Sequence, residues 1–135
     1  MKVVLDTNVL LIILPERSND HDLFLALLNG GYEICVTTDI LLEYEEVIAQ
    51  KNGNEIANAA LQLLTSLPNV HFIQKYYHWN LISADPDDNK FTDCAIAADA
   101  EFLVSDDKHF NVLISLDFPK IQVIAKQRFR ERLGL

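Results

Sequence analysis

Short apolar runs alternate with amphipathic segments along the 135 residues of the chain. Five runs rich in β-branched and aliphatic residues predict buried strands, because they are short and apolar on both faces. These runs are residues 2–5, 33–37, 70–73, 102–105 and 121–124. Segments with apolar residues at helical spacing predict helices between the strands. They are residues 8–15, 22–28, 38–51, 55–67, 90–100 and 126–133, with a short helix after residue 107.

This alternation predicts one α/β domain over residues 1–135, with three layers and a Rossmann-like, mostly parallel sheet of about five strands. Crossovers between parallel strands are right-handed. In such sheets, ligands bind outside the carboxyl ends of the strands, near the point where the strand order reverses. The fold class therefore predicts where a functional site lies.

Composition limits the possible functions. Half of the residues are hydrophobic, which is enough for a core, and no uninterrupted apolar run reaches the ~18 residues of a membrane span. An acid, Asp6, lies in the first apolar run, which a signal peptide would not contain. Cys35 and Cys94 are far apart, which indicates two reduced core thiols and fits a cytoplasmic location. The net charge of −9 disfavours nucleic-acid binding unless several acids converge on cations.

Carboxylates follow the predicted strands at the same edge of the sheet. Asp6 follows the first strand, and Asp106 and Asp107 follow the fourth. Glu43 lies early in the helix after the second strand, and Asp93 lies near the start of the helix before the fourth. Four separate segments therefore send an acid towards one edge.

Each acid has an ordinary structural explanation as well. An aspartate after a strand often caps a helix or forms a turn, and helical spacing alone does not choose between Glu43 and Glu45. The gathering of four acids at one edge is harder to explain in this way, because two carboxylates about 4 Å apart repel by roughly 4 kcal/mol at an effective dielectric of 20. An all-oxygen cluster suits hard ions such as Mg²⁺ or Mn²⁺.

Four motifs in this order resemble the PIN-domain family, specifically bacterial toxin components of toxin–antitoxin pairs related to VapC. They are VLDTNVL at 4–10, TDILLE at 38–43, DPDDNKFTDCAIA at 85–97 and FLVSDDKHF at 102–110. The resemblance covers nearly the whole chain. It implies a PIN-like three-layer fold and a cytoplasmic ribonuclease that cuts RNA with Mg²⁺ or Mn²⁺. It also implies a homodimer and a small antitoxin partner.

The resemblance assigns the catalytic and metal-binding roles to Asp6, Glu43, Asp93 and Asp107, so it selects Glu43 over Glu45. Asp106 beside Asp107 leaves two choices for the fourth acid. Supporting roles fall to Asn8, Asp88, Asn89, Ser105 and Asp106. Asn8 would order the loop around Asp6, and Asp88 and Asn89 would orient the third acid or a water. Phosphate contacts are expected from Lys90, Lys108 and His109, each of which also fits ordinary surface.

Other functions and surfaces stay open. A phosphatase of the haloacid dehalogenase type also begins with an aspartate after the first strand, but Asn8 stands where its second acid is needed. A receiver-like phospho-acceptor lacks its aspartate after a middle strand. A catalytically silent PIN module that binds RNA or protein is the remaining alternative. Basic residues 126–132 fit RNA, an acidic peptide or solvent, and Tyr76, Tyr77 and Trp79 fit a partner surface or internal packing.

Overall fold

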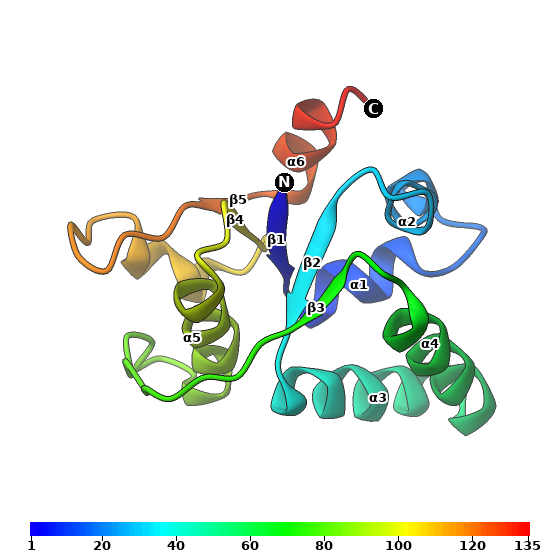
Figure 1. Ribbon diagram of the computed structural model, residues 1–135, viewed down its shortest axis with the longest axis horizontal. Coiled ribbons are helices and arrows are strands. Elements are labelled where there is room, and N and C mark those ends of the chain that lie inside the picture. The colour runs from blue at the N-terminus through cyan, green and yellow to red at the C-terminus, as the bar shows by residue number, and fades with distance from the viewer.

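Five parallel strands form the central sheet in the order β3-β2-β1-β4-β5. A computed structural model describes all residues 1–135 (Figure 1). The strands are β1 (Lys2–Leu5), β2 (Glu33–Val36), β3 (Val70–Phe72), β4 (Phe102–Val104) and β5 (Val123–Ile124). The predicted fold class is therefore confirmed, and the sheet is parallel throughout.

Helices cover both sides of this sheet (Figure 1). The first four are α1 (Thr7–Ile13), α2 (His21–Leu28), α3 (Thr38–Asn52) and α4 (Asn54–Ser66). Figure 1 shows these four on one side of the strands and α5 (Asn89–Ala98) on the other. The last helix, α6 (Lys126–Arg132), follows β5, and two 3₁₀ helices, η1 (Pro86–Asp88) and η2 (Lys108–Leu113), flank α5 and β4.

One apolar core joins these layers. The middle strands β1, β2 and β4 are almost entirely inaccessible to solvent, which explains why their sequences are apolar at consecutive positions. Tyr32, Tyr44, Phe91, Phe110 and Phe129 are the largest fully buried side chains. Both cysteines are free and buried, as predicted.

The strand order reverses at β1. The chain passes from β1 outward to β2 and β3, then returns through α5 to β4 on the other side of β1. Leu5 and Val104, the last residues of β1 and β4, are register partners. The residues that follow them, Asp6 and Ser105, therefore stand side by side at the carboxyl edge.

The structure differs from the prediction mainly at the ends of elements. Residues 73–85 form neither helix nor strand, and α5 begins at Asn89 after the 3₁₀ turn. The Asp85 carboxylate accepts the Asp87 N–H at 3.1 Å and so caps that turn. The last strand is only two residues long.

None of the helices combines the length and the apolar character that a bilayer crossing requires.

Candidate acidic site

Asp6 is held at the end of β1 in a buried position. Its backbone N–H donates to the Val104 carbonyl at 3.1 Å, which extends the β1–β4 pairing by one residue. The residue is only 5 % exposed. Burial raises the pKa of the Asp6 carboxyl from 3.8 to about 6, and the nearby charges of Asp88 and Asp107 act in the same direction.

Ser105 connects Asp6 to the fourth predicted acid. Its hydroxyl donates to Asp6 Oδ2 at 2.7 Å and accepts the Asp107 N–H at 3.0 Å. The Asp107 carboxylate in turn accepts the His109 N–H at 2.9 Å, where it caps η2. The supporting position predicted for Ser105 thus fits its contacts, and the serine fixes the spacing between the ends of β1 and β4.

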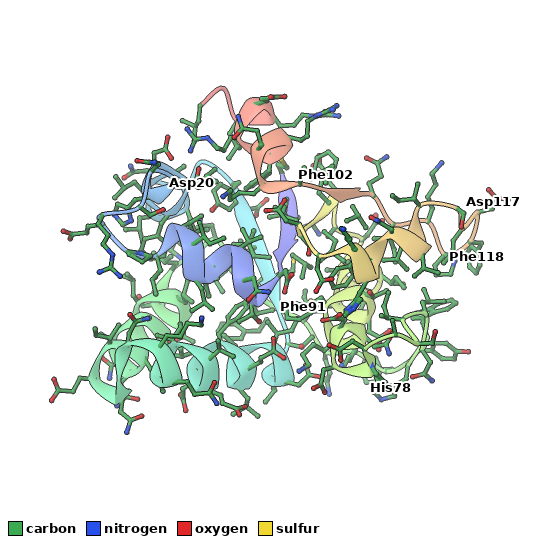
Figure 2. The ribbon with its side chains drawn as sticks, turned by 180° about the vertical axis from the view of Figure 1, so that it is seen from behind. Asp20, His78, Phe91, Phe102, Asp117 and Phe118 are labelled. Atoms are coloured by element: carbon green, nitrogen blue, oxygen red, sulfur yellow. The ribbon has the colours of Figure 1, made fainter.

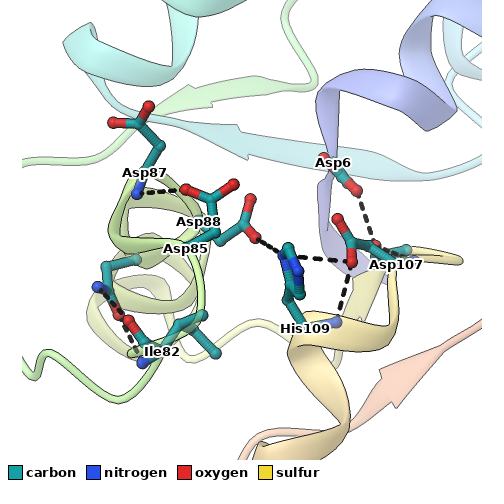
Figure 3. Close-up of polar contacts among 9 residues, drawn as sticks. Asp6, Ile82, Asp85, Asp87, Asp88, Asp107 and His109 are labelled. Atoms are coloured by element: carbon teal, nitrogen blue, oxygen red, sulfur yellow. Dashed lines mark hydrogen bonds and ion pairs between the residues drawn. The ribbon is translucent and has the colours of Figure 1, made fainter.

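Asp88 approaches this pair from the start of α5 (Figure 3). His109 lies between the two sides, with Nδ1 at 2.9 Å from Asp88 Oδ2 and 3.5 Å from Asp107 Oδ1. Burial raises the pKa of Asp88, with further increases from Asp85 and Asp107, and the hydrogen bond to Asp88 raises the pKa of His109. One donor atom each from Asp85, Asp88 and His109 lie within 4.8 Å of one another.

Glu43 comes from the second turn of α3 and already has two partners. The Thr7 hydroxyl donates to Glu43 Oε2, and Lys90 Nζ donates to Glu43 Oε1 at 2.7 Å. The Tyr44 hydroxyl donates to the Leu5 carbonyl at 2.5 Å, which anchors α3 to the end of β1. Glu43 is therefore bound to Thr7, the residue that follows Asp6.

Asp93 is buried in α5 but directs its carboxylate elsewhere. Oδ1 accepts the Trp79 N–H at 3.2 Å, and Oδ2 lies 3.6 Å from His78 Nδ1. Five residues after Asp88, it is displaced by about 7.5 Å along the helix and about 140° around it. Because α5 runs away from the carboxyl edge, the structure brings Asp88, rather than Asp93, to Asp6 and Asp107. The sequence signal for this was the position of Asp88 directly before the helix, at the end that faces the carboxyl edge.

The neighbouring predicted residues have distinct positions. Asp106 is exposed, and its Oδ1 accepts the Lys126 N–H at 3.1 Å, so it is bound to the start of α6. Asn8 is exposed, and its backbone N–H lowers the pKa of Asp6. Asp6, Asn8, Asp106 and Asp107 line a small cavity of about 190 Å³.

Of the remaining supporting and substrate-binding candidates, some already have a partner within the protein and one has none. The Asn89 side chain accepts the Ile82 N–H at 2.8 Å and donates to the Ile82 carbonyl at 3.0 Å, so it fastens the preceding loop (Figure 3). Lys90 is engaged with Glu43, whereas Lys108 is exposed and forms no ion pair in the chain. Of the predicted phosphate contacts, Lys108 is the cation that is free to bind an anion.

The basic C-terminal helix is mostly occupied by internal pairs. Lys126 Nζ lies 2.6 Å from Asp20 Oδ2, and Arg130 bonds both oxygens of Asp22. The Arg132 guanidinium lies 5.1 Å from the centre of the Phe102 ring. These contacts fasten α6 to α2 and to β4. They leave few of its basic side chains free to bind an external partner.

The donor set of the site fits a hard divalent cation. Asp6, Asp88 and Asp107 supply oxygens from three separate segments, and both Asp6 and Asp88 have raised pKa values. A cation among these oxygens would offset the repulsion and the loss of solvation that raise those pKa values.

The fold and the site thus define a parallel α/β domain with carboxylates gathered at its topological switch point. The sequence signature of the PIN domain matches residues 2–109. The chain therefore belongs to the PIN domain family, which confirms the resemblance seen in its motifs.

A solved structure of this fold is the crystal structure of VapBC2 from Rickettsia felis bound to a DNA fragment from their promoter. The similarity covers 93 % of this chain and 98 % of that chain, with a TM-score of 0.64 and 18 % sequence identity. No curated protein matches the chain.

Proposed function

We propose that this protein is a metal-dependent endoribonuclease that hydrolyses phosphodiester bonds in single-stranded or structured RNA. The observation that carries the proposal is that Asp6, Asp88 and Asp107 lie near one another at the carboxyl edge between β1 and β4, where the charges of Asp88 and Asp107 raise the pKa of Asp6. Membership of the PIN domain family supports it. We further propose that the protein acts in the cytoplasm as the toxin of a toxin–antitoxin pair.

The metal would be Mg²⁺ or Mn²⁺, held by Asp6, Asp88 and Asp107, with Glu43 nearby. Such an ion supplies Lewis-acid chemistry, by lowering the pKa of a water and stabilising charge on the leaving oxygen. Ser105 orients Asp6 through its 2.7 Å hydrogen bond. The catalytic assignment of Asp93 remains a prediction, and its contacts support a role in holding residues 78–79.

Lys108 is the group best placed to bind a substrate phosphate, because it is exposed beside Asp107 and has no internal partner. Lys90 would act through Glu43 instead, because their 2.7 Å ion pair holds its ammonium. The similarity to a chain of the VapBC2 assembly supports a small antitoxin as partner. The proposed homodimer is tested by the mass of the purified protein.

The direct test is cleavage of labelled RNA by the purified protein with Mg²⁺ or Mn²⁺, with EDTA, and with Asp6→Asn. We expect cleavage only by the unsubstituted protein with metal. Glu46→Gln, which changes an exposed acid on α3, is the matched control and should cleave normally. Cleavage that survives both EDTA and Asp6→Asn would contradict the proposal. Phosphate release from small esters would instead indicate a phosphatase, and RNA binding without cleavage a silent module.

A further inference from the structure

Three aromatic side chains from two loops form an exposed cluster, which we call the aromatic platform: Tyr77, Trp79 and Phe118. The Tyr77 and Trp79 ring centres are 4.7 Å apart, and those of Trp79 and Phe118 are 5.8 Å apart, both edge to face. Tyr77 is 63 % exposed and Phe118 79 %. Figure 2 shows Phe118 at the outer end of its loop, on the same side of the molecule as His78.

The platform is neither core nor lid packing. Aromatic rings bury large areas when they serve a core, and here two of the three remain mostly in solvent. Edge-to-face contacts use the rim of one ring against the face of another, so the arrangement fixes the rings and leaves other faces accessible. Exposed apolar surface of this kind marks an interaction site.

The platform is fastened to the helix that supplies the acidic site. The Trp79 N–H donates to Asp93 on α5, and Asn89 at the start of α5 holds both backbone groups of Ile82. Asp88 precedes Asn89 and belongs to the acidic site. The platform and the acidic site are therefore attached to the same end of α5, at positions five residues apart.

Charge indicates what kind of ligand the platform would bind. The chain has 11 basic residues against 20 acids, and several bases that could attract phosphates are engaged internally, including Lys75, Lys90, Lys126 and Arg130. An RNA-binding protein of this charge gains little from phosphate contacts. Stacking of nucleobases on aromatic rings contributes about 1–3 kcal/mol per base and tolerates any base sequence.

We infer that the aromatic platform binds unpaired nucleobases of single-stranded RNA by stacking, next to the acidic site. This inference rests on the proposed function, because the stacked strand is the one whose phosphates reach Asp6, Asp88 and Asp107. It assigns to Tyr77, Trp79 and Phe118 the binding of bases and leaves the cleavage chemistry to the acids.

Trp79 makes the inference directly testable, because it is the only tryptophan in the chain. Its fluorescence is recorded in EDTA, where no cleavage is expected, during titration with a ten-nucleotide oligouridine. We expect saturable quenching by the oligouridine and none by an abasic sugar-phosphate oligomer of equal length. Equal quenching by both oligomers would overturn the inference, because phosphates rather than bases would then cause it.

Phe118→Ala and Phe118→Leu remove the ring and keep the fluorescent reporter. We expect both to weaken oligouridine binding by about five- to one-hundred-fold, and Phe118→Tyr to restore it. Leu25→Ala, which trims a half-exposed side chain on α2, is the control and should bind normally. Because Phe118 is mostly in solvent, its loss should leave the circular-dichroism melting curve unchanged. Unchanged affinity in both ring-less variants would overturn the inference.

Two further measurements separate the inference from its alternatives. If the fluorescence and the molecular mass change together with protein concentration alone, a second copy covers the platform and the inference fails. If Phe118→Ala cleaves RNA with metal and binds oligouridine with unaltered affinity, base binding by the platform is refuted and the ribonuclease proposal stands. Base-dependent quenching without any metal-dependent cleavage would keep base binding by the platform and overturn the ribonuclease.

Discussion

Replacing Asp6 by Asn is expected to stabilise the metal-free protein at neutral pH while it abolishes cleavage. The Asp6 carboxyl is buried, and burial raises its pKa from 3.8 to about 6. Above pH 6 the carboxylate is charged in both the folded and the unfolded chain, but the folded environment disfavours that charge. At 1.36 kcal/mol per pKa unit, the difference corresponds to about 3 kcal/mol of lost folding free energy.

The asparagine side chain removes this cost and retains an oxygen that can accept the Ser105 hydroxyl hydrogen. Urea unfolding in EDTA at pH 7.5 should therefore show a gain of up to about 3 kcal/mol for Asp6→Asn. The gain should shrink as the pH falls through 6 towards 4, because the folded wild-type protein then takes up the proton that neutralises Asp6. Glu46→Gln, an exposed acid on α3, should show no comparable gain.

Metal should reverse the order of stability. Mn²⁺ that binds the folded state alone raises the free energy of unfolding by mass action, so the wild-type protein should gain stability with added Mn²⁺ and Asp6→Asn should gain little. The reasoning is refuted if Asp6→Asn is less stable than the wild type at pH 7.5 in EDTA. It is also refuted if the difference between the two proteins is the same at pH 7.5 and pH 5.

Three further substitutions test the contacts around the site. Asp88→Asn should reduce metal-dependent cleavage by more than about 100-fold, because Asp88 faces the other acids. In the same assay, the cleavage rate of Asp93→Asn should stay within a few-fold of the wild-type rate, because Asp93 is directed to Trp79. The reverse result would restore Asp93 as the third acid. Ser105→Ala should lower cleavage by about 10–100-fold and move the acidic limb of its pH profile upward, because the serine hydrogen bond lowers the pKa of Asp6. Tyr44→Phe should cost about 1–2 kcal/mol in urea unfolding, because it leaves the buried carbonyl at the end of β1 without its hydroxyl partner, and an unchanged midpoint would contradict this.

The sequence predicted the elements well where apolar periodicity was strong. The five strands and the main helices lie where the pattern placed them, because a strand buried on both faces must be apolar at consecutive positions. The pattern failed to describe residues 73–85, where aromatic side chains have no periodic order. That segment is placed by contacts with distant residues, such as Asn89 with Ile82 and Asp93 with Trp79.

The candidate site was predicted in part. That Asp6, Asp106 and Asp107 lie at one edge followed from the strand ends, since parallel neighbours bring their carboxyl ends together. The preference for Asp107 over Asp106 and the supporting role of Ser105 came from the family resemblance. The choice between Asp88 and Asp93 did not follow from the strand ends, because it depends on where α5 begins and on its rotation against the sheet. If the predicted helix is placed one residue out of register, the expected direction of every side chain changes by 100° around the helix axis.

The sequence by itself determined the parallel α/β layering, the family and the edge at which acids gather, because these depend on local periodicity and on chain order. Only the tertiary structure decided which carboxylates meet, which cations are already engaged, and that Phe118 joins Tyr77 and Trp79. Those outcomes depend on distances between segments far apart in the chain. No local pattern of residues encodes them.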